Sequence, residues 1–436
     1  MPTATVAPQR RQTARHLRRL GNLAFASFKH PRQRERGQDY LRGLIAQPGR
    51  RTVTGVAEAA CCCKQSLQHF ITDSTWEVEP VMKALALATQ RAVGRGQALI
   101  IDDTGQAKQG SRSPGVQRQY SGTLGKIGNC QVAVSLDHAG SRGPWPVNWR
   151  LFMPTAWEHS HVRRAARVPR DLGHVPKQQL ALQMTQQALA WGLKPLPVLA
   201  DAAYGNDHAF RRGLEAQGLD YMADVDAGLV AHPEWVRPQT IMKAGGGRGR
   251  PPLPRLRQRP RTLASLARGH ALRRVEGLRG SYLALRVRPA GRGVSPDADG
   301  QLKACWLVVW KRSDGTRKHL LSNLPEDASL KALARLASLR WRIERDYREL
   351  KQCVGLAHFQ GRTLLGWQRH ATLCGLAHLL LLWRLLESSE SSIYKALSAL
   401  RPLIIALIGR CPTCGHSPPG HGPAGGGVDE AGVLTK

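Results

Sequence analysis

Two short apolar runs, each followed at once by aspartate, constrain the fold of this chain more than any other feature. Residues 98–101 run into Asp102 and Asp103, and residues 197–200 run into Asp201. Apolar runs of this length that end in turn-forming residues are typical of buried strands. Because open α/β sheets hold their ligands at the ends of strands, these aspartates are candidates for one ligand site.

Segments with strand-like and helix-like patterns alternate around these runs. The further strand-like segments are 131–136, 148–152, 221–225, 281–287 and 304–310. The helix-like segments are 177–191, 208–217, 329–352 and 367–386. Strands that are followed by alternating helices and strands predict an α/β fold with a mixed sheet.

Residues 1–94 have the pattern of a small helical region with basic flanks. Apolar groups recur at helical spacing between residues 38 and 90, the first being Tyr40, Leu41 and Leu44. Residues 1–51 carry twelve Lys or Arg and only two acidic residues. Short helices with basic flanks predict an all-helical DNA-binding domain, with a purely structural bundle as the alternative.

The net charge of the chain indicates an anionic partner. Its 436 residues include 64 Lys and Arg against 31 Asp and Glu, which gives a formal charge of +33 and a pI near 10.9. Nucleic acid, anionic lipid and an acidic protein are the candidates, and we favour nucleic acid. Residues 237–274 carry eleven Lys or Arg and no acid, which predicts a basic loop that contacts DNA.

Two features argue against a membrane or secreted protein. In the most apolar region the longest stretch without a formal charge is 370–383, shorter than the roughly 20 apolar residues that a membrane-spanning helix needs. The first nineteen residues contain five arginines and no apolar segment of the kind found in secretory signals. We therefore expect a cytoplasmic protein associated with the nucleoid.

The nine cysteines do not form the pattern of a disulfide framework, because three are consecutive and the others are scattered. Cys411 and Cys414 have metal-like spacing and are followed by His416 and His421. Structural zinc sites usually show a second ligand pair at suitable spacing, and this segment is rich in Gly and Pro. Reduced thiols are therefore favoured over zinc at Cys411 and Cys414.

A third candidate carboxylate lies in the helix-like segment 329–352. At 3.6 residues per turn, Arg340, Glu344, Arg348 and Lys351 share one face of the predicted helix. Glu349 is acidic too, but it lies about 140° around the helix from Glu344 and is expected to point elsewhere.

Two or three converging carboxylates bind hard divalent cations, and in a strongly basic protein the natural substrate is a phosphodiester. A pair of Mg²⁺ ions would activate the attacking oxygen and stabilise the leaving oxygen. The basic residues Arg340 and Lys351 would hold the DNA backbone in register.

These three motifs resemble those of insertion-sequence DDE transposases of the IS-four-like superfamily, closest to the group numbered seven-oh-one. The first family motif, apolar residues and then Asp-x-Ser/Thr, fits Asp102 with Thr104, and Asp103 stays open as the alternate first carboxylate. The segment 118–129 also resembles this group. The second motif fits Asp201 within Leu-Ala-Asp-Ala-Ala-Tyr-Gly.

The third family motif is Tyr-x2-Arg-x3-Glu-x6-Lys. Arg340, Glu344 and Lys351 match it in type and spacing, whereas the Tyr position falls on Ala337. The resemblance implies that Asp102, Asp201 and Glu344 are the catalytic metal ligands. The proposed DNA contacts are Arg340, Lys351, Arg348, Lys126 and Arg118.

The resemblance further implies a ribonuclease-H-like core with a mainly β insertion between Asp201 and Glu344. The expected divisions of the chain are 1–94, 95–230, 231–325, 326–390 and 391–436: a helical DNA-binding domain, the first part of the core, the insertion, the completed core, and a final helix with a Gly/Pro-rich disordered tail.

The implied activity is cleavage of insertion-sequence ends and joining of the 3′-hydroxyl to target DNA. It would use Mg²⁺, or Mn²⁺ in its place, and double-stranded DNA, with a dimer on synapsed ends. A non-catalytic DNA-binding relic or domesticated transposase, and a Mg²⁺-dependent nuclease without strand transfer, are the alternatives.

Overall fold

A computed structural model of the chain describes residues 6–122, 124–159, 161–239, 256–340, 343–388 and 390–409. The chain forms two compact units. The first, here called the helical unit, takes its described residues from 1–81, 349–361 and 365–436. The second, here called the sheet unit, consists of 82–348 and 362–364. The domain boundaries drawn from the sequence stay predictions.

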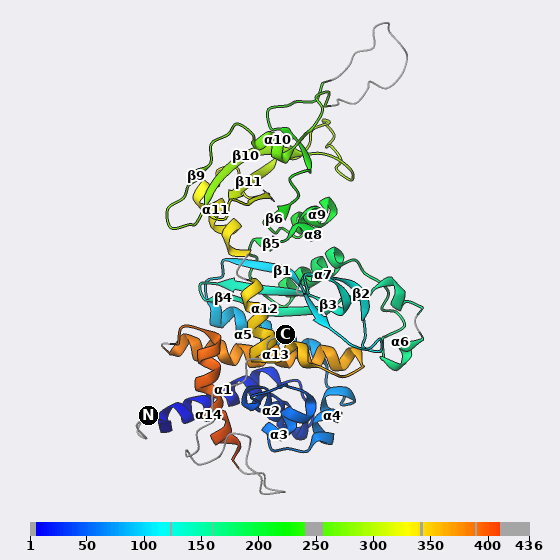
Figure 1. The fold of residues 1–436 in the computed structure, drawn as a ribbon, viewed down its shortest axis with the longest axis vertical. Helices are drawn as coiled ribbons and strands as arrows, with labels where there is room; N and C mark the ends of the chain where they lie inside the picture. The colour runs from blue at the N-terminus through cyan, green and yellow to red at the C-terminus, as the bar shows by residue number, and fades with distance from the viewer. Residues whose placement is uncertain are drawn as a thin grey trace. The chain divides into compact units, whose positions relative to one another are not determined.

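The sheet unit is built on a mixed sheet that contains strand β1 (Ala98–Ala107), which is third in the strand order counted from β2 (Gln117–Ser121) (Figure 1). On one side, β1 pairs antiparallel with β3 (Lys126–Gly140). On the other side it pairs parallel with β5 (Val198–Ala200), which pairs parallel with β6 (Tyr221–Val225). Strand β3 also pairs antiparallel with β2 and β4 (Gly143–Leu151).

The strands that follow β6 in the chain extend the same sheet. Strand β12 (Arg317–Ser322) pairs antiparallel with β6, and the order continues through β11, β10, β7 and β8. These strands are β11 (Cys305–Lys311), β10 (Ser281–Pro289), β7 (Val230–Pro233) and β8 (Arg261–Thr262), and β9 (Arg273–Arg274) pairs with β10. The predicted α/β fold with a mixed sheet is confirmed.

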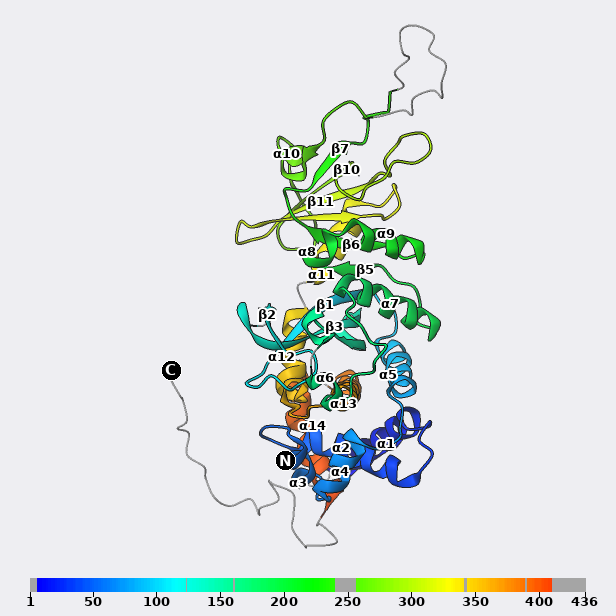
Figure 2. The ribbon, with the colours of Figure 1, turned by 90° about the vertical axis from the view of Figure 1, so that its right-hand side faces the viewer.

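Burial explains why the central strands are almost wholly apolar. Residues 98–101 of β1 are fully buried, and all residues of β5 and β6 are buried. Strands that are covered on both faces need apolar residues at every position rather than at alternate ones. Helix α7 (Lys177–Ala190) packs on β3 and β4, and Figure 2 shows it beside α9 (His208–Ala216).

The strand that carries Asp102 is longer than the sequence predicts. We expected it to end at Ile101, but β1 continues to Ala107. The reason is that β3 supplies hydrogen bonds along the whole length of β1, up to the pair Ala107 and Cys130. Only the neighbour on the other side, β5, stops at Ala200, so Asp102 lies where the parallel partner ends.

The predicted helix over 329–352 is described as two helices, α11 (Leu330–Leu339) and α12 (Ile343–Cys353). Arg340 caps the end of α11, and α11 packs on β10 and β11. The remaining helical elements of the sheet unit are α6 (Val162–Ala165), α8 (Ala202–Gly205), α10 (Leu263–Ala267) and a 3₁₀ turn at Thr155–Trp157.

The helical unit joins helices from both ends of the described chain. Helix α2 packs against α3, α4 and α14, and α1 packs against α14. Its elements are α1 (Val6–Ala24), α2 (Pro31–Ala46), α3 (Val53–Ala59), α4 (Lys64–Thr72), α14 (Ile393–Ile408) and a 3₁₀ turn at Leu356–His358. Three of the described helices have residues in each unit: α5 (Val78–Val93), α12 and α13 (Leu364–Glu387). The helical pattern predicted near the N-terminus is confirmed, whereas its role in DNA binding stays a prediction.

None of the helices in the described part of the chain is both long and apolar enough to cross a membrane. Cys411 and Cys414, the candidate zinc ligands, and residues 240–255 of the predicted basic loop lie outside the described residues. The same holds for the predicted tail after residue 409. The described part of the basic loop is not irregular throughout: it forms β8, α10 and β9, because the apolar residues of α10 are buried.

A buried arginine ties α13 to the end of α4 inside the helical unit. Arg369 is 1% exposed and donates hydrogen bonds to the carbonyl oxygens of Ile71 (3.0 Å), Trp76 (2.6 Å) and Ser74. Its guanidinium carbon lies 4.7 Å from the centre of the Trp76 ring. Burial lowers the pKa of Arg369 to about 10, with Asp73 opposing the shift, so the side chain stays charged at neutral pH.

We expect Arg369→Met to lower the free energy of unfolding by about 3 kcal/mol, because it leaves three buried carbonyl groups without their donor. Urea unfolding followed by circular dichroism measures the change. The exposed Arg32→Met in α2 is the matched control and should shift the unfolding free energy by less than about 0.5 kcal/mol. Equal effects of the two substitutions would contradict this assignment.

Candidate active site

The register of three parallel strands brings three aspartates to one level of the sheet. Ile100 of β1 pairs with Leu199 of β5, so two residues further on Asp102 stands beside Asp201. Asp201 has an extended backbone (φ −82°, ψ −179°) and prolongs the line of β5. Ala200 pairs with Ala223 of β6, which places Asp224 next to Asp201. Residues that are level in parallel strands share a face, so the three carboxylates form one row.

Asp102 is the most strongly perturbed member of this row. Its side chain is 13% exposed, and its Oδ1 accepts a hydrogen bond from the Asp103 backbone N–H at 2.8 Å. Burial raises the pKa of Asp102 to about 8; Arg340 opposes this shift and the negative charge of Asp201 adds to it. Without a further cation, the Asp102 carboxyl therefore holds its proton at neutral pH.

Asp201 belongs to the row and also caps a helix. It is the N-cap of α8, and its Oδ1 accepts hydrogen bonds from the backbone N–H groups of Ala203 (3.0 Å) and Tyr204 (3.4 Å). Burial raises the pKa of Asp201, while the positive charge of Arg340 works against the shift. Both bonds of the cap use Oδ1, so Oδ2 is the oxygen that the cap does not engage.

Asp103 is held by a different set of groups. Its Oδ2 lies 2.5 Å from the Lys177 ammonium of α7, and its Oδ1 accepts a hydrogen bond from the Tyr204 hydroxyl at 2.5 Å. Successive residues of a strand point to opposite faces, so Asp103 leaves the face on which Asp102 lies. This arrangement supports Asp102 over Asp103 as the first carboxylate, and the assignment stays a prediction.

Arg340 supplies the positive charge of the row. Its Nη2 lies 3.1 Å from Oδ2 of Asp224, and its Nη1 lies 3.7 Å from Oδ2 of Asp102. The Lys318 ammonium also reaches Asp224 Oδ2, at 3.4 Å. Burial alone would lower the pKa of Arg340, but Asp224, Asp102 and Asp201 together outweigh it and raise that pKa.

Sequence reasoning missed Asp224. It is 6% exposed and follows the apolar residues Tyr221, Met222 and Ala223, which is the same pattern of apolar run and aspartate that marked Asp102 and Asp201. The signal was present, but residues 221–225 were interpreted only as a strand. The contacts of Asp103 with Lys177 and Tyr204 had no signal in the sequence, because they depend on how α7 and α8 pack.

Whether the third predicted carboxylate, Glu344, belongs to this row stays a prediction. Glu344 lies in the first turn of α12, but its side chain is outside the described part of the structure. Arg348 is exposed, and Lys351 lies half-buried in the last turn of α12. Ala337, at the position where the family motif has Tyr, is 3% exposed within α11. The site roles of Glu344, Arg348 and Lys351 therefore stay predictions.

The carboxylates fit a hard divalent cation by the chemistry of their donor atoms. Asp102 and Asp201 offer oxygen ligands at one level, as Mg²⁺ and Mn²⁺ prefer. The Arg340 guanidinium, itself a cation, already lies 3.7 Å from the Asp102 carboxylate. Among the described residues no group of three His, Cys, Asp or Glu is arranged to hold a metal, so a complete set would need a further ligand such as Glu344.

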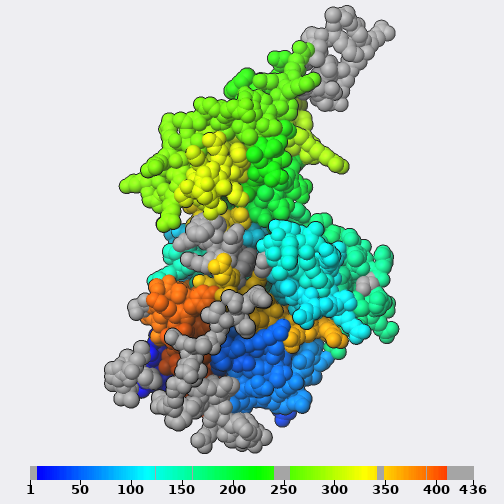
Figure 3. Space-filling model, viewed as in Figure 1, coloured from blue at the N-terminus to red at the C-terminus, as the bar shows by residue number. Residues whose placement is uncertain are grey.

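The predicted DNA contacts Arg118 and Lys126 lie on the β2–β3 hairpin. Arg118 pairs with Asn129 and Lys126 pairs with Ser121. Between them the side chains of Tyr120 and Ile127 are 64% and 59% exposed and stand opposite each other. The cyan part of the surface in Figure 3 includes this hairpin. Side chains alternate along a strand, so Arg118 shares a face with Tyr120 and Ile127 whereas Lys126 lies on the opposite face, and the two contacts stay predictions.

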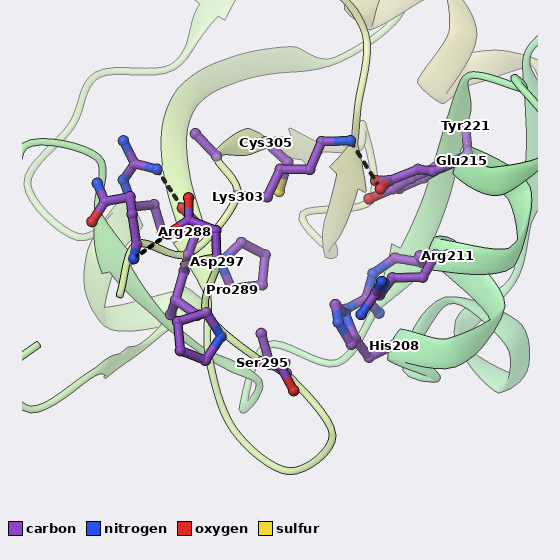
Figure 4. Close-up of a pocket in the computed structure, with 16 residues that line it drawn as sticks. His208, Arg211, Glu215, Tyr221, Arg288, Pro289, Ser295, Asp297, Lys303 and Cys305 are labelled. Atoms are coloured by element: carbon purple, nitrogen blue, oxygen red, sulfur yellow. Dashed lines mark hydrogen bonds and ion pairs between the residues drawn. The ribbon is translucent and has the colours of Figure 1, made fainter. Parts of the chain in front are cut away.

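A cavity of about 530 Å³ lies elsewhere in the sheet unit, between α9 and the segment that joins β10 to β11 (Figure 4). Arg211 and His208 extend toward it from α9, and Arg288 and Asp297 lie on the opposite wall. Lys303 closes one side through an ion pair with Glu215 at 2.9 Å. The three aspartates of the row do not line this cavity.

Comparison with known proteins connects the row of aspartates to a family. The model of the family described as DDE superfamily endonuclease matches residues 24–282, more than half of the chain. The match includes Asp102, Asp201 and Asp224 and ends before Arg340 and Glu344. The resemblance to DDE proteins drawn from the sequence motifs is confirmed.

A protein of Microchaete diplosiphon with the description "Probable transposase for insertion sequence element IS701" is 30% identical over 186 residues. The match covers 42% of this chain and 46% of that protein, so it spans less than half the length of the relative.

The raised pKa of Asp102 predicts a pH-dependent gain in stability for Asp102→Asn. In the unfolded chain this carboxyl ionises near 3.8, whereas in the metal-free folded protein it ionises near 8. The folded state therefore binds more protons between these values, and wild-type stability falls as pH rises through that window. Relative to wild type, we expect Asp102→Asn to gain stability progressively from pH 4 to pH 8 and to level off above.

Urea unfolding at several pH values in the presence of EDTA measures this difference. The exposed Asp226→Asn, two residues beyond Asp224, is the matched control and should show no such trend. A difference between Asp102→Asn and wild type that is independent of pH would contradict the buried, proton-holding state of Asp102.

Proposed function

The chain belongs to the DDE superfamily endonucleases, and we propose that it is a transposase that cuts the ends of an insertion sequence and joins the 3′-hydroxyl to target DNA. The observation that carries the proposal is the level placement of Asp102 and Asp201 on adjacent parallel strands, since these are the residues that match the first two DDE motifs. The description of the relative from Microchaete diplosiphon agrees with this activity.

In this proposal Asp102, Asp201 and Glu344 hold divalent cations, Mg²⁺ or Mn²⁺. Such ions activate the attacking oxygen and stabilise the leaving oxygen of a phosphodiester. Arg340 would offset the charge of the carboxylates, and its contact with DNA stays a prediction. Lys351 and Arg348 would contact DNA phosphates near Glu344. The loss of a proton from Asp102 would accompany cation binding, because its carboxyl is protonated in the metal-free protein.

The proposal extends to fold and assembly. The order β3-β1-β5-β6, with β1, β5 and β6 parallel, supports a ribonuclease-H-like core. Strands β7 to β12 would be the β insertion, residues 231–325, between the second and third motifs. We propose double-stranded DNA, with the terminal inverted repeats and the target, as the partner. A dimer on synapsed ends and association with the nucleoid follow from the resemblance alone.

Two other functions remain in competition. A Mg²⁺-dependent nuclease without strand transfer agrees equally well with the family description, which names endonucleases. A DNA-binding relic or domesticated transposase is suggested by Ala337, the departure from the third motif. Both alternatives keep the row of aspartates, so an experiment on DNA products is needed to separate the three.

We expect wild-type protein with Mg²⁺ to nick a plasmid that carries the inverted repeats flanking its gene. Glu344→Gln and Asp102→Asn should each lower the nicking rate by more than about 100-fold, because each removes a charged ligand of the cations. The control is Asp226→Asn, which leaves the row intact. If wild type and Glu344→Gln are equally inert while both bind the ends, the protein is a relic. If pre-cut ends are supplied and no joined product forms, it is a nuclease.

The hairpin contacts predict a change in the salt dependence of DNA binding. Each phosphate contact contributes about 0.9 to the slope of log K against log salt concentration. The double variant Arg118→Gln/Lys126→Gln should therefore reduce the magnitude of that slope by roughly 1 to 2. Fluorescence anisotropy with labelled duplex DNA at increasing NaCl measures the slope.

Lys303→Gln is the control for the salt experiment, because its ammonium already pairs with Glu215. It should change the slope less than the hairpin variant does. An unchanged slope in the hairpin variant would remove Arg118 and Lys126 from the DNA surface.

A further inference from the structure

We propose that Asp224 is a positioning residue that holds the Arg340 guanidinium beside the catalytic carboxylates and draws it away from Asp102 when a divalent cation binds. The inference rests on the proposed function and deepens it. It assigns a role to an acid that is not part of the three DDE motifs.

The geometry makes Arg340 a shared partner of two acids. One nitrogen of its planar guanidinium contacts Asp224 at 3.1 Å and another lies 3.7 Å from Asp102. The shorter contact is to Asp224, the acid that no motif assigns. A guanidinium presents its donors in a fixed fork, so it can keep the bond to Asp224 while the longer contact to Asp102 opens.

Charge explains why two positions of Arg340 are needed. Without metal, Arg340 lies against both Asp102 and Asp224, and its positive charge offsets the negative charge of the row. A divalent cation at Asp102 and Asp201 would instead repel the guanidinium. Because Arg340 stays paired with Asp224, binding of the cation does not leave the buried guanidinium without a partner.

The surroundings of Asp224 suit this role. The carboxylate is 6% exposed and receives Lys318 at 3.4 Å in addition to Arg340. It lies within β6, which is paired with β5 on one side and β12 on the other, so its position is fixed by the sheet. Arg340, by contrast, follows the last residue of α11 and is attached to the unit by a helix end.

Binding of Mn²⁺ to the full-length protein without DNA, measured by electron paramagnetic resonance, tests the proposal. Arg340→Gln removes the competing cation, and we expect Mn²⁺ to bind about 3- to 10-fold more tightly. Asp224→Asn removes the carboxylate that holds Arg340 when the cation binds. Arg340 then stays beside Asp102, and we expect Mn²⁺ to bind about 3- to 10-fold more weakly. The two substitutions thus have opposite signs, although each removes one partner of the same ion pair.

The double variant decides whether Asp224 acts through Arg340. We expect its Mn²⁺ affinity to lie within about twofold of Arg340→Gln alone, since Asp224 has no guanidinium left to hold. Asp226→Asn, in the same segment but bonded to Asn206, is the matched control and should equal wild type. Weaker binding in Asp224→Asn that persists in the double variant would overturn the proposal, because Asp224 would then act on the cation directly.

A second substitution keeps the test valid if Asp224→Asn fails to fold. Arg340→Lys leaves Asp224 untouched, but its single ammonium cannot contact both carboxylates as the fork does. Its Mn²⁺ affinity should lie between wild type and Arg340→Gln, and an affinity equal to wild type would overturn the proposal, as would the absence of Mn²⁺ binding in wild type. If Mn²⁺ binding follows the expected pattern but no variant or wild type cuts DNA, the positioning role stands and the proposed transposase activity fails.

Discussion

The parallel register of β1, β5 and β6 is the constraint on which the candidate site depends. Hydrogen bonds between these strands fix Asp102, Asp201 and Asp224 at one level, whatever charge they carry. Three acids in a row would be unfavourable in a buried place unless cations accompany them. The fold meets this demand with Arg340 and Lys318, and the burial of Asp102 keeps one of the acids protonated. These two basic residues offset part of the negative charge of the row, whereas the buried Asp102 lowers stability as the pH rises.

The two faces of β1 carry different contacts. Asp102 joins the row on one face, while its neighbour Asp103 binds Lys177 and Tyr204 on the other. The Asp103 contacts tie β1 to α7 and α8, and α8 is the short helix that Asp201 caps. The two adjacent acids thus make different contacts: Asp102 belongs to the row, and Asp103 joins β1 to α7 and α8. Under the proposed function, Asp102 supplies a ligand and Asp103 secures the helix that Asp201 caps.

Local patterns in the sequence were enough to predict the strands around 98–101, 197–200 and 221–225 and the candidates Asp102 and Asp201. They were not enough to predict that β1 continues past Asp102, because its extra length depends on pairing with β3, which is remote in sequence. The same limit hid the role of Asp224: its strand was found, but its level beside Asp201 depends on a register that no local pattern encodes. The predicted helix over 329–352 matched in type, since α11 and α12 lie within it. Residues 341–342 are outside the described residues, so the shared face of Arg340 and Glu344 stays a prediction.

Asp201 both caps α8 and belongs to the row, so a substitution there can remove the charge and still keep the cap. Asparagine caps helices about as well as aspartate, so the change at this position keeps the turn of α8 while removing a negative charge from the row. A single base transition in the codon is sufficient to make that change. Under the proposed function, the product would keep its fold and its basic residues but lack one carboxylate of the proposed cation site. It would then bind the same DNA as intact copies of the protein and inhibit them.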